Sequence, residues 1–162
     1  MRIRASKASQ ARALVACEVG EVFYALPVEQ VQEIIQPMHL TALPHAPPGV
    51  VGAVEHRDAI VPILDLGQRL GYGPTREPRR KWVLLRGTQR SLGIVVARVH
   101  EVIEVSESQL RPAPEVGDIA ARAASHVISY RGVMAFVLDI ASVAQLAEAV
   151  EVRAFLTENG AT

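Results

Sequence analysis

The hydrophobic positions of this chain fall into short runs that glycine and proline separate. Most runs are rich in β-branched residues and end at residues that suit turns, a pattern typical of short strands. Residues 13–28 indicate two strands joined at Gly20. Residues 127–140 indicate a hairpin that turns at Arg131 and Gly132. Further strands, the first of them a buried one, are predicted at 59–66, 83–87 and 91–105.

Two stretches carry other patterns. Residues 28–35 space their apolar side chains in a way that suits either one or two helical turns or a twisted strand. Residues 141–156 are rich in Ala, Leu and Glu, so we expect a C-terminal helix there, capped by Asp139 or Ser142. Residues 1–12 are expected to form a flexible N-terminal segment.

The chain also repeats itself. Residues 25–35 align with residues 93–103, and 56–66 align with 130–140 in the same order. The identical pairs include Val31 with Val99, Glu33 with Glu101, Arg57 with Arg131, and Asp65 with Asp139. Such a duplication predicts two similar β units of about five short strands each, which pack together because neither half could bury much alone. Short strands between Gly/Pro turns favour small closed barrels, since closure removes exposed edges.

Composition narrows the functions open to the chain. Its 162 residues carry a net charge of zero, which argues against nucleic acid or an anionic membrane as the main partner. The single cysteine, Cys17, excludes an internal disulfide and lies in an apolar run, so we predict that it is buried. No apolar run approaches the ~20 residues of a membrane helix and no signal peptide precedes the fold, so we expect a soluble, intracellular protein.

Residues 55–58, Glu-His-Arg-Asp, are the first candidate for chemistry. His-Arg-Asp also opens the catalytic loop of protein kinases, but the Gly-rich loop and the Asp-Phe-Gly motif of those enzymes are absent. The histidines lack the spacing of a metal-ligand pair. Asp65 and Asp139 each precede a helical segment, so we expect them to cap rather than to catalyse. The sequence therefore predicts no enzyme, no metal and no cofactor.

The repeat gives these residues a structural explanation. Arg57 and Arg131 occupy the same place in two hairpins, and Asp58 matches Gly132. Gly adopts left-handed backbone freely, and Asp is among the few other residues that do. We therefore predict that Arg57 and Asp58 form a hairpin tip, where an arginine is well suited to bind a carboxylate.

Four stretches together resemble the CheW-like family, which comprises chemotaxis coupling proteins and the terminal domains of CheA-type histidine kinases. They are FYALPVEQVQEII, PHAPPGVVGAVEHRDAIVPILDL, SLGIVVARVHEVIEV and LRPAPE. The resemblance covers residues 13–148 and implies a mainly β fold of two intertwined small five-stranded SH3-like barrels with a C-terminal helix. We expect the subdomains at about 13–70, with part of the C-terminal region, and at about 80–140. Residues 149–162 would end the helix and form a tail.

The resemblance implies a non-catalytic cytoplasmic adaptor, recruited to receptor arrays without direct membrane contact. Its partners would be the regulatory domain of a CheA-type histidine kinase and the cytoplasmic tip of methyl-accepting chemoreceptors. The positions that correspond to the kinase-facing edge are Val31, Glu33 and Ile34. The positions that correspond to the receptor-facing groove between the barrels are Gly52, Arg57, Gly93 and Val99.

One departure from the family pattern affects the arginine. The family usually has Asn-Leu-Arg-Gly where this chain has Glu55, His56, Arg57 and Asp58. Glu55 or Asp58 could pair with Arg57 and compete with a receptor carboxylate, tuning binding by ~0–1 kcal/mol. Two alternatives stay open: a diverged protein that binds only one partner and regulates or sequesters it, and an unrelated double barrel that binds a small ligand or metal.

Overall fold

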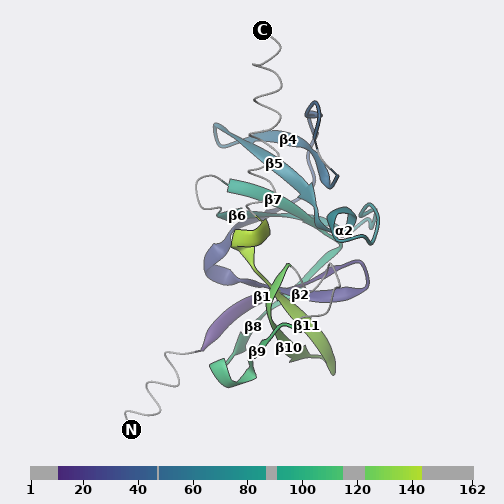
Figure 1. Cartoon of the computed structure of the whole chain (residues 1–162). Coiled ribbons are helices and arrows are strands. Elements are labelled where there is room, and N and C mark those ends of the chain that lie inside the picture. The colour runs from purple at the N-terminus through teal and green to yellow at the C-terminus, as the bar shows by residue number, and fades with distance from the viewer. Residues whose placement is uncertain (1–10, 47, 87–90, 115–122, 144–162) are drawn as a thin grey trace.

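Strands make up most of the molecule in the computed structural model and gather into two bodies (Figure 1). The structure describes residues 11–46, 48–86, 91–114 and 123–143. Within these residues the helical segments are short, so the mainly β fold class is confirmed. The strands form two sheets, which we call barrel A and barrel B.

Barrel A contains six strands, one more than the sequence predicted. The additional strand is a two-residue pairing at Arg111–Pro112. Its shortness and its proline leave no strand pattern to read. In order across the sheet the strands are β8 (Arg98–Val105), β1 (Arg12–Val19), β2 (Val22–Pro27), β11 (Val133–Leu138), β10 (Ala124–Tyr130) and β9 (Arg111–Pro112).

Barrel B contains five strands, and a backbone bridge joins the segment after its first outer strand to its other outer strand. In order they are β3 (Val31–Ile35), β6 (Lys81–Arg86), β7 (Ser91–Val96), β5 (Ala59–Asp65) and β4 (Val50–His56). After β3 the chain turns back, and Thr41 exchanges two backbone hydrogen bonds of 2.9 Å with Ala53 of β4. This bridge brings the segment that leaves one edge of the sheet against the other edge, and so helps to close the barrel.

Each barrel is built from both halves of the chain, so the expected division at about 13–70 and 80–140 does not match the two sheets. The hairpin β1–β2 of the first half joins the later strands of the second half, and β6–β7 joins β3 to β5. The reason lies in the connections. Only Ala97 separates β7 from β8, which is too short for a hairpin turn, so the chain runs straight on into the other sheet.

The two ambiguous or terminal segments are partly resolved. Residues 28–35 form a single 3-10 turn, η1 (Val28–Gln30), followed by strand β3. At the other end a helix begins at Ile140, and the Asp139 carboxylate accepts a hydrogen bond of 2.7 Å from the Ser142 hydroxyl. Most of the helix expected over 141–156 lies outside the described residues, as does most of the N-terminal segment 1–12.

Asp65 shows the predicted capping role in full. Its carboxylate is buried and accepts hydrogen bonds from the Gln68 N–H at 3.4 Å, at the start of α2 (Leu66–Arg69). The N–H and hydroxyl of Thr75 donate to it at 2.7 and 2.6 Å. This carboxylate therefore caps a helix and anchors the loop that follows.

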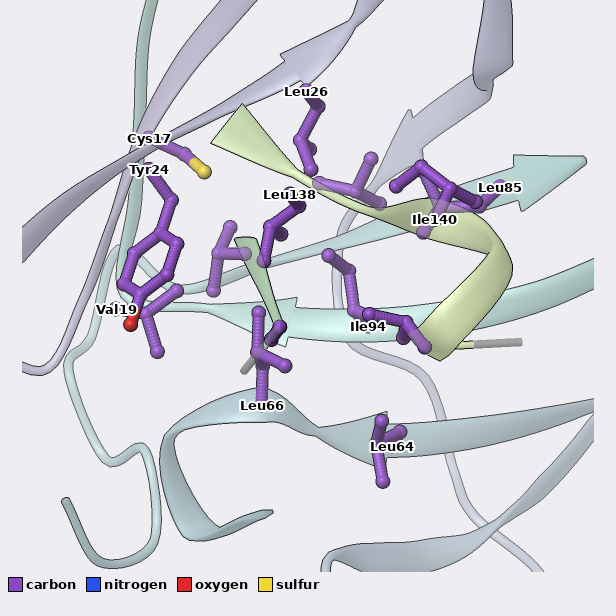
Figure 2. Close-up of a cluster of buried hydrophobic side chains, with 14 of the residues drawn as sticks. Cys17, Val19, Tyr24, Leu26, Leu64, Leu66, Leu85, Ile94, Leu138 and Ile140 are labelled. Atoms are coloured by element: carbon purple, nitrogen blue, oxygen red, sulfur yellow. The ribbon is translucent and has the colours of Figure 1, made fainter. Parts of the chain in front are cut away.

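The largest apolar core lies between the barrels (Figure 2). It takes side chains from both sheets, including Cys17, Leu26, Leu64, Ile94 and Leu138. Alternate residues of β1 face opposite ways, so this strand serves both the shared core and a second cluster inside barrel A. Cys17 is fully buried in this core, which confirms the prediction, and its burial raises the pKa of the thiol to about 12.

Candidate functional site

The hairpin that joins β4 to β5 presents Arg57 at its tip. His56 pairs with Ala59 at the end of the ladder, which leaves Arg57 and Asp58 as the two turn residues. Both have left-handed backbone, with φ of 51° and 64°. A two-residue hairpin turn of this kind needs positive φ at both positions, so the predicted hairpin tip is confirmed.

Three side chains meet at this tip, and one of them comes from another strand. The Nε2 of His56 lies 2.9 Å from Oε2 of Glu33 on β3. The Arg57 guanidinium donates to the same carboxylate, from Nε to Oε2 at 3.2 Å and from Nη2 to Oε1 at 3.3 Å. The Arg57 side chain is 71% exposed, whereas the His56 and Glu33 side chains are 16% and 29% exposed. The tip therefore carries an accessible guanidinium on a partly covered carboxylate.

The partner of Arg57 is not the one that the sequence suggested. Among the described residues neither Glu55 nor Asp58 forms an ion pair with Arg57, and Glu33 takes that place. Barrel closure explains the difference, because it brings β3 and β4 together from opposite edges of the sheet. The repeat held the one available signal, since Glu33 and Arg57 each recur in the second half.

Barrel A carries an equivalent cluster at the tip of its own hairpin, β10–β11. Arg131 has a φ of 49°, and its Nη2 donates to Oε2 of Glu101 at 2.9 Å. The Tyr130 hydroxyl donates to the same oxygen at 2.5 Å, in the place that His56 takes in barrel B. The Arg131 guanidinium also lies 5.0 Å from the centroid of the Tyr130 ring. The duplication thus preserved a Glu, ring and Arg arrangement, with the ring as the variable member.

Hydrogen bonds set the electrostatics of both carboxylates. The bonds from Arg57 and then His56 lower the pKa of Glu33 below its usual value. In barrel A the bonds from Tyr130 and then Arg131 lower the pKa of Glu101 in the same direction. Both carboxylates therefore stay ionised well below neutral pH.

Replacing Glu33 by Gln is expected to reduce the acid sensitivity of the fold. A lowered carboxyl pKa adds stability above the unfolded value, and that stability is lost as the pH falls through the folded value. The melting temperatures of the parent and the Glu33→Gln variant should therefore converge between about pH 7 and about pH 3. The melting temperature of Glu101→Gln should converge with that of the parent over the same range, because the pKa of Glu101 is lowered as well. A difference in melting temperature that stays constant across this range would contradict the prediction.

The other predicted contact residues divide into exposed and buried positions. Ile34 is exposed, whereas Val31 and Val99 are half-buried and pack against the shared core. Gly52 and Gly93 are buried in barrel B. A Cβ on Gly93 would lie 2.6 Å from Cδ1 of Ile63, so close packing explains this glycine without a partner.

An exposed residue that the sequence pattern placed in a buried strand is Ile60, whose relative exposure is 70%. It lies at the start of β5, directly after the hairpin tip, where the strand projects beyond the core. A continuous apolar run predicts burial for every member, so the pattern gave no signal for this position. Together with Ile34 it adds apolar surface to barrel B.

The described residues contain neither a cluster of metal ligands nor a membrane-spanning helix. Within the part of the chain that the structure describes, no three His, Cys, Asp or Glu side chains gather as metal ligands would. None of the helices in the described ranges has both the length and the hydropathy needed to cross a membrane.

Comparisons with known proteins agree on one family. The family model described as CheW-like domain matches residues 13–148. The chemotaxis protein CheW of Rhizobium meliloti is 30% identical over 135 residues, covering 82% of this chain and 86% of that protein. Protein FrzA of Myxococcus xanthus is 30% identical over 133 residues, covering 81% of this chain and 82% of that protein. The crystal structure of the scaffolding protein TtCheW from Thermoanaerobacter tengcongensis superposes with a TM-score of 0.75 at 24% identity, covering 80% of this chain and 85% of that one, and so shares the fold.

Proposed function

This chain belongs to the family of CheW-like domains, and from that premise we propose that it is a non-catalytic adaptor that couples chemoreceptors to a CheA-type histidine kinase. The observation that carries the proposal is the extent of the family match, which spans both barrels and the core between them. Its partners would be the kinase regulatory domain and the cytoplasmic receptor tip. It would work in the cytoplasm, where these partners recruit it to receptor arrays.

The Arg57 tip supports a docking role by its chemistry. Its guanidinium is accessible and already holds a carboxylate, Glu33, in the geometry that a partner's Asp or Glu would take. The contact between Arg57 and Glu33 also joins the two predicted surfaces. Glu33 belongs to the kinase-facing set and Arg57 to the receptor-facing set, so a partner that engages one changes the surroundings of the other.

A second candidate is an adaptor that binds only one of these partners. The observation that favours it is the engagement of Arg57 by Glu33 through two hydrogen bonds, which a receptor carboxylate would have to displace. An exposed ion pair of this kind contributes little free energy, so it weakens receptor binding rather than preventing it.

Co-purification decides between these functions. The full chain is mixed with a CheA-type regulatory domain and, separately, with a receptor-tip fragment at micromolar concentrations. Both should co-elute with it on size-exclusion chromatography if it couples them. Binding of the kinase domain alone would identify the one-partner adaptor, and binding of neither would remove the proposed function.

A further inference from the structure

At the tip of barrel B this chain places an imidazole, His56, where its own repeat has a phenol in barrel A. The equivalent ring in barrel A is Tyr130, whose pKa is raised by burial and by its bond to Glu101. A phenol of that kind keeps its proton through the physiological range, whereas an imidazole changes charge between about pH 5 and 8. Of the two rings that bond a tip carboxylate, the one in barrel B is therefore of the residue type that changes charge in this range.

The geometry determines which atoms donate and which accept the hydrogen bonds at this tip. A carboxylate can only accept, so the His56 Nε2 must carry a proton to bond Oε2 of Glu33 at 2.9 Å. The Arg57 Nε–H is aimed at the same oxygen at 3.2 Å. Two donors thus share one acceptor, and their nitrogens lie only 3.3 Å apart. While the imidazole is neutral, the cluster holds one cation, the Arg57 guanidinium, and one anion, the Glu33 carboxylate.

The charged groups around His56 are few. Glu33 on β3 and Arg57 in the turn contact it directly. Glu55 precedes it on β4 and Asp58 follows Arg57, and both side chains are exposed and form no ion pair with this cluster among the described residues. Because the pKa of Glu33 is lowered, that carboxylate stays ionised throughout the range in which imidazoles in general change charge.

We propose that, once His56 is protonated, the Glu33 carboxylate pairs with His56 instead of Arg57. The Arg57 guanidinium is then free to bind a carboxylate on the partner, so that docking strengthens as the pH falls. This inference rests on the proposed docking function of Arg57. It assigns to His56 the role of a positioning residue that sets how readily the arginine leaves its internal partner.

Exposure decides which cation moves. Once the imidazole is charged, two cations share one carboxylate with their nitrogens 3.3 Å apart, and one of them must withdraw. The His56 ring is short and mostly covered, whereas the Arg57 side chain is long and 71% exposed. The guanidinium can therefore move into water at little cost, and the imidazolium keeps the carboxylate.

The other barrel offers a matched control residue. His100 on β8 lies 2.6 Å from Oε1 of Glu18 on β1 and is covered to the same degree as His56. Its ring contacts the edge of Phe23, with centroids 5.5 Å apart, and no arginine shares its carboxylate among the described residues. Protonation of His100 therefore has no guanidinium to release.

The first test follows the two side chains directly in the full-length protein labelled with ¹⁵N. The Arg57 Nε–H signal is recorded by NMR from about pH 8 to about pH 5.5, together with the imidazole signals of His56 and His100. The Arg57 signal should shift with the midpoint of His56. In His56→Gln, which keeps a neutral donor but cannot titrate, the shift should vanish, and in His100→Gln it should persist. An Arg57 signal that stays still while His56 titrates would overturn the proposal.

The second test measures binding of the receptor-tip fragment at about pH 7.5 and about pH 6. The affinity of the parent protein should rise about two- to fivefold on acidification, the range that an exposed ion pair can supply. His56→Gln should lose this rise and His100→Gln should keep it. An equal rise in His56→Gln would overturn the proposal and leave the adaptor function standing. If the fragment binds no variant at either pH, the chain does not couple receptors, and the NMR test alone decides whether protonation of His56 releases Arg57.

Discussion

An Arg57→Glu variant is expected to bind a receptor-tip fragment about 10- to 100-fold more weakly than the parent protein, the loss typical of a charged anchor at the centre of an interface. The cause is twofold. The variant removes the guanidinium that would bind the partner's carboxylate. It also places a second carboxylate beside Glu33, which repels an acidic partner.

The stability of this variant should change little. Arg57 lies at a hairpin tip and its side chain is 71% exposed, so the lost ion pair contributes little to the stability of the fold. For a chain of this size the melting temperature should therefore fall by less than about 4 °C. A much larger fall would show that Arg57 closes the barrel rather than binds a partner.

The duplication supplies the control. Arg131→Glu makes the same change at the equivalent tip of barrel A, where Arg131 pairs with Glu101 and its side chain is 51% exposed. Isothermal titration calorimetry with the receptor fragment should give the parent affinity for Arg131→Glu and the weakened one for Arg57→Glu. Equal losses in both variants would contradict a site specific to barrel B.

Local features of this molecule were accessible from the sequence. The two hairpin tips follow from matching residues, because Gly at one tip indicates the left-handed backbone that Asp58 adopts at the other. The capping role of Asp65 follows from its place between an apolar strand and a helical segment. Both inferences use residues that are neighbours in the chain, and the hairpin tip is confirmed in both halves of the repeat.

Features that depend on how distant segments of the chain meet could not be predicted from the sequence. The pairing of Glu33 with Arg57 exists only because barrel closure brings the edge strands together, and no spacing along the chain encodes that closure. The exchange of hairpins between barrels depends on the single residue Ala97 between β7 and β8, within an apolar run that reads as one strand. Ile60 is exposed because its strand projects past the core, which periodicity does not report.

The second large effect concerns Gly52, which the family resemblance placed in the receptor-facing groove and which lies buried in β4. Its φ is 149°, a conformation that side chains rarely adopt, and a Cβ there would lie 2.6 Å from the carbonyl oxygen of Thr41. That oxygen accepts one of the two hydrogen bonds of the bridge to Ala53. We therefore expect Gly52→Ala to destabilise the fold by about 3–5 kcal/mol, since backbone strain and the loss of the bridge add.

Thermal unfolding should show this as a melting temperature about 6–20 °C lower, at 2–4 °C for each kcal/mol. Gly132→Ala is the matched control, because Gly132 also has positive φ, at 78°, but a Cβ there meets nothing within 4 Å. Only backbone strain of ~1–2 kcal/mol acts at Gly132, so the melting temperature of this variant should fall by only about 2–8 °C. If Gly52→Ala instead melts like the parent and loses receptor binding, Gly52 contacts the partner itself. The expected pair of results would mean that this glycine serves the receptor surface only by letting barrel B close behind Arg57.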